Sequence, residues 1–129
     1  MRVRFCSPVK SHMGYAELGR IVINQLVQAG FDVTVVEIPL QGSAADFGEL
    51  GAQAERLIGN ADSADVNIVN MIPPLFERYR LPGARNIGYT TFESDRIPAA
   101  WVGQCNQMDA IWVQAEWVRD VFAASGVVV

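Results

Sequence analysis

Short apolar runs alternate with amphipathic stretches along the whole chain. The apolar runs are rich in β-branched residues and show little alternation, which is typical of strands that are covered on both faces. Three of the runs stop at Pro8, Pro39 and Pro73, because proline cannot continue a strand. The pattern predicts strands at 3–6, 33–38, 66–72, 85–91 and 110–114.

Between these strands, apolar residues recur at steps of three and four, which predicts helices. In the clearest case Leu18, Val22 and Leu26 share one helix face, and Gly30 ends the helix. A proline at position 98 suits the first turn of a short helix. The predicted helices span 15–29, 44–58, 98–107 and 117–124, with a charged loop or short helix at 76–83.

This order of elements predicts an α/β fold: a Rossmann-like, doubly wound parallel sheet of about five strands, with right-handed crossovers and helices on both faces. A length of 129 residues fits one such domain spanning 1–129. In such sheets, ligands bind outside the carboxyl ends of the strands. Candidate site residues are therefore expected in the loops at 7–15, 37–41, 71–75, 91–96 and 114–117.

Composition and charge exclude several classes of protein. Half of the residues are hydrophobic and 19% are charged, which is a globular composition. A net charge of −4, with Lys10 as the only lysine, argues against generic nucleic-acid binding. No apolar stretch approaches the ~18 residues of a membrane span, and no signal-peptide pattern begins the chain. Cys6 and Cys105 suggest neither a disulfide framework nor a metal site, so a reduced, cytoplasmic setting is expected.

The loop after the first strand lacks the usual nucleotide motifs. Gly14 and Gly19 have the spacing of a P-loop, but Arg20 and Ile21 stand where lysine and a hydroxyl residue are required. The dinucleotide fingerprint is also absent, although Glu37 lies where a ribose-binding carboxylate would. The alternative for Glu37 is a solvated carboxylate at a strand end, and nicotinamide binding would rest on this residue alone.

Polar residues in two loops are candidates for chemistry. Gly14 precedes a helix, whose free N–H groups attract phosphate, unless the turn simply needs glycine. His12, the only histidine, is a candidate acid, base or phosphate donor, or a solvated loop residue. Glu93, Asp95 and Arg96 form a polar cluster that suits either a site or a helix cap. No metal-ligand cluster is visible, so no metal is predicted.

Two further sets of residues are expected to be structural. The tryptophans should pack the core and the helix-to-sheet contacts rather than line a sugar site; they are Trp101, Trp112 and Trp117. The arginines near the third loop should form a solvated face; they are Arg78, Arg80 and Arg85.

The C-terminal third carries the most specific motifs: NIGYTTFESDRIPAAW at 86–101, MDAIWVQAEW at 108–117 and SGV at 125–127. They resemble the N-terminal domain of family 4 (group 1) glycosyltransferases of the GT-B fold. Members of that family read as a strand, a threonine or aromatic residue, Glu, a short Ile/Leu-Pro-x-x-Trp helix, Asp-x-Ile/Val-Trp-Val and a helix ending in Ser-Gly-Val. The order of elements extends the resemblance over nearly the whole chain. Ala115 departs from it, because serine is common there.

The resemblance implies the acceptor-side domain of a nucleotide-sugar-dependent glycosyltransferase, which transfers a glycosyl group to an acceptor hydroxyl. The turn around Gly14 corresponds to the loop that approaches the donor diphosphate and the acceptor, and the segment after the fourth strand lines the cleft. It implies no catalytic residue by position. The substrate- or diphosphate-binding residues expected on this basis are His12, Gly14, Tyr15, Thr91, Glu93 and Ser94.

Partners follow from the same resemblance. The nucleotide-sugar is the donor substrate, no cofactor is tightly bound, and the acceptor is a carbohydrate or lipid. The donor-binding C-terminal domain, supplied in cis or in trans, is absent here, so the chain alone is expected to be inactive. The full-length enzyme would be cytoplasmic and peripheral to the membrane. The alternative is a stand-alone, non-catalytic GT-B-like module that binds a ligand or partner; uncovered apolar surface would favour homo-oligomers in either case.

Overall fold

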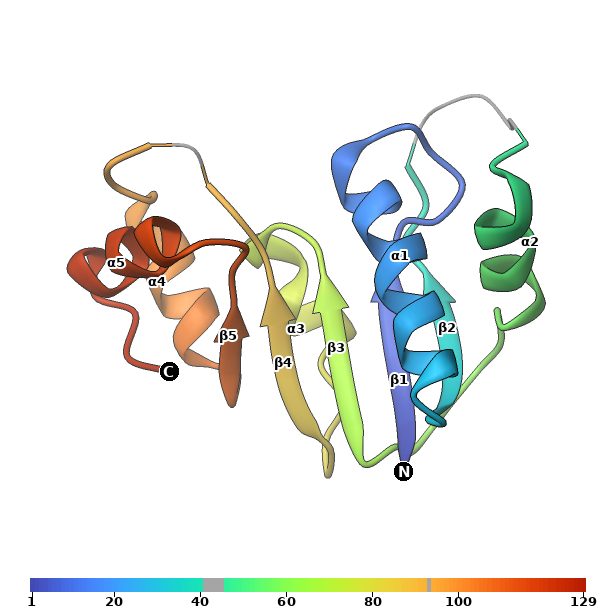
Figure 1. Ribbon diagram of the computed structural model, residues 1–129. Helices are drawn as coiled ribbons and strands as arrows, with labels where there is room; N and C mark the ends of the chain where they lie inside the picture. The colour runs from blue at the N-terminus through green and yellow to red at the C-terminus, as the bar shows by residue number, and fades with distance from the viewer. Residues whose placement is uncertain (41–45, 93) are drawn as a thin grey trace.

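The computed structural model describes residues 1–40, 46–92 and 94–129, and its strands form one sheet (Figure 1). Within these residues the strands pair in parallel in the order β2-β1-β3-β4-β5. The prediction of an α/β fold with a five-stranded parallel sheet is confirmed, and the arrangement is compatible with a Rossmann-like doubly wound fold. The strands are β1 (Arg2–Ser7), β2 (Asp32–Glu37), β3 (Val66–Asn70), β4 (Arg85–Tyr89) and β5 (Ala110–Trp112).

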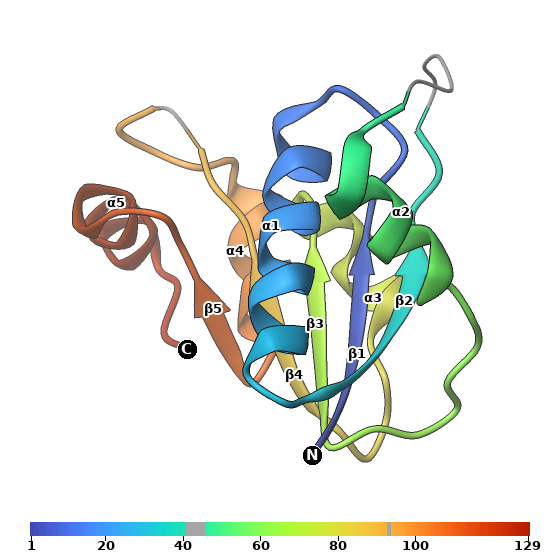
Figure 2. The same cartoon turned by 45° about the vertical axis from the view of Figure 1, so that its right-hand side comes forward.

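Helices cover both faces of this sheet. Two of them, α1 and α2, lie together on one face, while the short turns after β3 and the helix α4 lie on the other, with α5 beside α4 (Figure 1, Figure 2). The described helices are α1 (Gly14–Gln28), α2 (Gly48–Arg56), the 3₁₀ turn η1 (Pro73–Leu75), α3 (Phe76–Tyr79), α4 (Ala99–Asn106) and α5 (Glu116–Ser125).

Alternation along the strands divides the core into two layers, because successive side chains of a strand point to opposite faces. Phe5 and Ile68 pack on the α1 and α2 side. Cys6 and Val69, their neighbours in sequence, pack on the α4 and α5 side. All four side chains are almost completely buried, so the nearly continuous apolar runs reflect coverage of both faces.

Glycine ends two of the helices, as the sequence predicts. Gly30 follows α1 with φ +92°, and Gly126 follows α5 with φ +115°. Both residues adopt the left-handed conformation that side chains disfavour, so they stop a helix at little cost.

Several predicted boundaries are wrong. The strands expected at 66–72, 85–91 and 110–114 end two residues earlier, at Asn70, Tyr89 and Trp112. Met71 continues the apolar run because it is buried in the core, although it lies beyond the paired register. The helix expected at 44–58 begins at Gly48, whose φ of +70° is incompatible with a right-handed helix before it; positions 44 and 45 lie outside the described residues.

The prediction for the tryptophans is wrong for two of them. Trp112 and Trp117 are 43% and 55% exposed, whereas Trp101 is half-buried and packs edge-on against Phe92. Trp112 ends the last strand, where no described helix covers the α1 side of β4 and β5 (Figure 1). The arginines at 78, 80 and 85 are exposed as predicted. None of the described helices is both long and apolar enough to span a bilayer.

Candidate functional site

The direction in which successive strands are added to the sheet reverses between β1 and β3. After β1 the chain forms β2 on one side, and then crosses to β3 on the other. In open α/β sheets, a ligand crevice lies outside the carboxyl ends of the strands at such a switch point. Here that position is bordered by the loop before α1 and by the segments that follow β3 and β4 (Figure 1).

Tyr15, in the first turn of α1, connects this loop to the end of β4. Its hydroxyl lies 3.0 Å from Oγ1 of Thr90 and accepts a longer, 3.4 Å hydrogen bond from the backbone N–H of Thr91. The structure therefore brings together Tyr15 and Thr91, two of the residues that the sequence predicts for the site.

Asn70, at the carboxyl end of β3, holds the same first turn of α1 by hydrogen bonds. Its Nδ2 donates to Oγ of Ser7 at 3.0 Å and to the backbone oxygen of Tyr15 at 2.8 Å. The side chain is completely buried, yet its Oδ1 has no partner among the described residues. A buried acceptor without a donor is costly, which marks this as a place for a water or a ligand.

Gly19 allows α1 to lie close to the side chains of Ser7 and Asn70. A Cβ atom at Gly19 would collide with Oγ of Ser7 and crowd the amide of Asn70. The second glycine of the P-loop-like spacing therefore serves the packing of α1 on β1 and not a phosphate loop.

Gly14 begins α1 and is exposed, and a Cβ atom there would meet nothing within 4 Å. The N-cap residue, Met13, provides no side-chain cap. Ala16 and Glu17 donate to the carbonyl of Met13, which leaves the N–H groups of Gly14 and Tyr15 without a partner among the described residues. The positive end of α1 is thus open to an anion beside Tyr15.

His12 turns away from this group and toward α2. Its exposed ring packs edge-on against Phe47, with ring centroids 4.9 Å apart. The tertiary structure therefore separates His12 from the contact between Tyr15 and Thr91.

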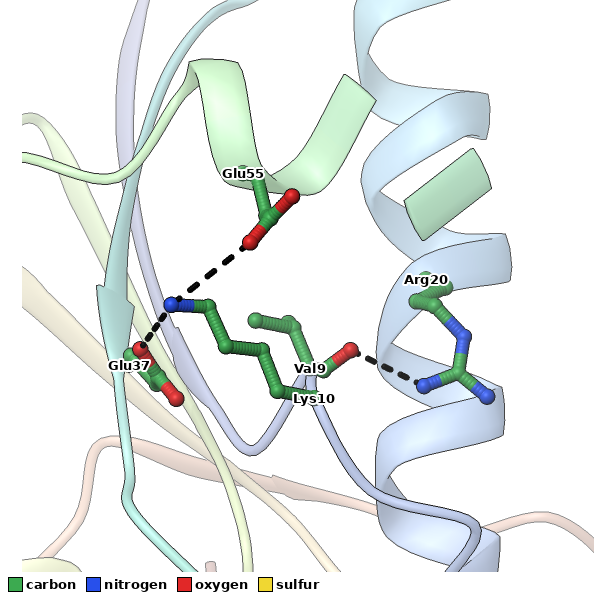
Figure 3. A network of polar contacts seen from close by, with 5 residues as sticks. All are labelled: Val9, Lys10, Arg20, Glu37 and Glu55. Atoms are coloured by element: carbon green, nitrogen blue, oxygen red, sulfur yellow. Dashed lines mark hydrogen bonds and ion pairs between the residues drawn. The ribbon is translucent and has the colours of Figure 1, made fainter. Parts of the chain in front are cut away.

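Arg20 is a residue that the sequence reasoning missed. Its side chain is 7% exposed, and Nη1 donates to the carbonyl of Val9 at 2.9 Å (Figure 3). Nη1 also donates to the carbonyl of Ser11 at 2.9 Å, and the guanidinium lies 4.0 Å from the ring centroid of Phe47. Burial lowers the pKa of Arg20 from its ordinary value, and the nearby Glu17 carboxylate opposes this change. The one sequence signal was its position directly after Gly19, in the failed P-loop motif.

Lys10 forms an ion pair with Glu37. Its Nζ lies 3.4 Å from Oε2 of Glu37 and 3.6 Å from Oε1 of Glu55, so it ties the loop to β2 and α2 (Figure 3). Glu37 is thus a partly buried ion-pair partner of Lys10 rather than a simple solvated carboxylate. A small hollow of about 130 Å³ lies beside this lysine and is lined in part by Val9 and Phe47.

The polar cluster after β4 is open. Ser94, Asp95 and Arg96 are exposed, and Ser94 Oγ lies 3.4 Å from Oδ1 of Asp95. The N-cap residue of α4 is Pro98, and no side chain of the described residues forms a capping hydrogen bond at this helix end. Asp95 and Arg96 therefore do not cap α4. Glu93, the residue predicted for the cleft, lies outside the described residues.

Neither thiol suits nucleophilic chemistry. Cys6 and Cys105 are free and fully buried, and burial raises the pKa of each to about 12. In the described part of the chain, no group of three His, Cys, Asp or Glu side chains could hold a metal ion.

Comparisons with protein families, with curated proteins and with solved structures give no match to this chain.

Proposed function

We propose that this chain is the acceptor-side domain of a nucleotide-sugar-dependent glycosyltransferase that transfers a glycosyl group to an acceptor hydroxyl. The contact of Tyr15 with Thr90 and Thr91 carries the proposal. It joins the loop before α1 to the segment after β4, and these are the two segments that the family resemblance assigns to the substrate cleft.

The chemistry available at this contact suits such a cleft. The open N–H groups of Gly14 and Tyr15 can receive the charge that develops on the leaving diphosphate, since a helix N-terminus stabilises anions. The hydroxyls of Tyr15 and Thr91 offer neutral hydrogen bonds to a sugar or an acceptor. No residue is assigned as the base. The nucleotide-sugar would be held mainly by the donor-binding domain, so this chain alone transfers no sugar.

Titration of the isotope-labelled chain with UDP and with GDP tests the proposal by NMR. Weak binding should shift the amide signals of Gly14 and Tyr15, because diphosphate oxygens approach those N–H groups. Tyr15→Phe removes the hydroxyl that contacts Thr90 and should weaken binding about threefold to tenfold. Tyr79→Phe is the matched control, because Tyr79 contributes its backbone carbonyl and not its hydroxyl to the described hydrogen bonds.

Three results would count against the proposal. Efficient transfer or hydrolysis of UDP- or GDP-sugars by the chain alone would contradict its inactivity. Absence of any shift at Gly14 with either nucleotide would contradict the diphosphate contact. Micromolar binding of NAD would instead favour a dinucleotide-binding domain.

The exposed tryptophans favour a second candidate, a non-catalytic binding module. Trp112 and Trp117 are 43% and 55% exposed at the β5 end of the sheet, and exposed aromatic residues are enriched in interfaces. Analytical ultracentrifugation of the chain and of Trp112→Ser tests this role. Self-association that the substitution abolishes would support the module; a monomer at all concentrations would remove a second copy as its partner.

A further inference from the structure

A second polar site lies on the other side of α1, facing α2. The side chains of His12, Glu17, Arg20 and Phe47 line a shallow, open hollow of about 390 Å³. Arg20 and His12 both contact the ring of Phe47, at 4.0 Å and 4.9 Å between centres, so one aromatic side chain positions both groups. This hollow does not include the hydroxyls of Tyr15 and Thr91.

Arg20 is a buried cation without a counterion among the residues that the structure describes. None of the described carboxylates lies within ion-pair distance of its guanidinium. Burial of a charge is costly, and two carbonyls, one ring and the nearby Glu17 carboxylate compensate it only in part.

The donors that remain on Arg20 have the geometry of an oxyanion ligand. Both hydrogen bonds to the loop use Nη1, so Nε and Nη2 have no acceptor among the described residues, and they lie away from Val9 (Figure 3). Nε–H and one N–H of Nη2 are parallel, which lets them meet two oxygens of one phosphate or carboxylate. The imidazole of His12 has at least one N–H in either protonation state.

We propose that Arg20, assisted by His12, binds the phosphate group of a small soluble molecule in the hollow between α1 and α2. The oxyanion supplies a negative charge beside the guanidinium and takes both of its parallel N–H groups. This inference does not rest on the proposed function, because it requires no nucleotide-sugar and uses a different side of α1. Glu17 lies in the same hollow as an exposed carboxylate and weakens the site by repulsion across solvent.

The test is a titration of the full chain with inorganic phosphate at constant ionic strength, observed through the NMR signals of arginine Nε–H groups. The signal that disappears in Arg20→Lys should shift saturably in the native chain. Arg20→Lys should lower the affinity about tenfold, since lysine keeps the charge but loses the parallel donors. Arg119→Lys is the matched control: Arg119 is an exposed arginine of α5 and should leave the affinity unchanged.

Two variants of exposed side chains keep the test decisive if Arg20→Lys does not fold. His12→Ala should weaken phosphate binding several-fold, and Glu17→Gln should strengthen it about twofold to fivefold by removal of a repulsive charge. The proposal is overturned if no arginine signal saturates, if Arg20→Lys binds phosphate normally, or if Glu17→Gln does not tighten binding. Arg20-dependent sedimentation with phosphatidic acid vesicles, without a response to inorganic phosphate, would overturn the small-molecule source.

Discussion

Two asparagines of β3 show how the same side chain serves different ends of the molecule. Asn67 and Asn70 are both completely buried, but they are three residues apart in a strand and so lie on opposite faces of the sheet. Asn67 donates to the carbonyl of Tyr79 and to Oδ1 of Asn86, and its own Oδ1 accepts from Arg4. Every polar atom of the Asn67 side chain is therefore paired.

Asn70 is different because only its amide nitrogen is paired. It holds Ser7 and the first turn of α1, while its Oδ1 has no partner among the described residues. The cluster around Asn67 also contains a buried atom without a partner among the described residues, Nε of Arg4, but that atom belongs to a neighbouring side chain and not to the asparagine itself. The Asn67 side chain thus joins β3 to β1 and β4, whereas Asn70 joins the carboxyl end of β3 to the first turn of α1.

The largest expected effect belongs to the cluster around Asn67. Asn86→Ala removes four hydrogen bonds, which join β4 to Asn67, to both backbone groups of Leu81 and to the carbonyl of Ala84. The free energy of unfolding in urea should fall by about 4 kcal/mol, because each lost bond contributes about 1 kcal/mol. The control is Asn106→Ala, whose bonds are exposed and should contribute less than about 1 kcal/mol in total.

A smaller effect is expected at the open end. Asn70→Ala removes two hydrogen bonds and also an unpaired acceptor, so the loss should be about 2 kcal/mol or less in the same urea titration. A loss as large as that of Asn86→Ala would break the comparison, because it would mean that the two hydrogen bonds of Asn70 contribute as much as the four of Asn86.

The third prediction concerns the pH dependence of stability at Cys6, which contacts Asn67. Cys6 donates to Asn67 from Sγ at 3.5 Å, and burial raises the pKa of this thiol from 9.0 to about 12. The unfolded chain therefore loses the thiol proton first as pH rises, so the stabilisation is complete below pH 9 and is lost between pH 9 and 12. Through Cys6, the free energy of unfolding should fall by about 1 kcal/mol between pH 9 and pH 10, because the thiol of the unfolded chain is already half deprotonated at pH 9.

Cys6→Ala should remove this part of the pH dependence, and Cys105→Ala should remove a similar part, because the pKa of Cys105 is also raised to about 12. A double variant with the unchanged slope would show that neither thiol is responsible. Rapid alkylation of Cys6 in the native state at pH 8 would contradict its burial.

The sequence predicted the elements better than their ends. Periodicity is local, so the five strands and the helix that ends at Gly30 were recognisable. The ends of β3, β4 and β5 depend on which neighbouring strand is still present to pair with, and apolar residues such as Met71 continue beyond that point. Trp112 shows the same limit, because a pattern does not say which face of an edge strand a helix covers.

The sequence predicted which loops border the candidate site. It did not predict which side chains in those loops touch one another. The rule for parallel sheets selected the loop with Tyr15 and the segment with Thr91, and the fold brings both to the switch point. It did not place His12, which turns to Phe47. It also missed Arg20, because an arginine is normally assigned to the surface.

By itself, the sequence determined the order of strands and helices, the helix ends at Gly30 and Gly126, and the loops that could carry a site, because these depend on backbone preferences and on hydrophobic spacing between near neighbours. Only the tertiary structure decided that Gly19 must be small, that Arg20 is buried and that Asn70 lacks a partner. The physical reason is that close approach, desolvation and hydrogen-bond pairing are properties of groups brought together from distant positions of the chain.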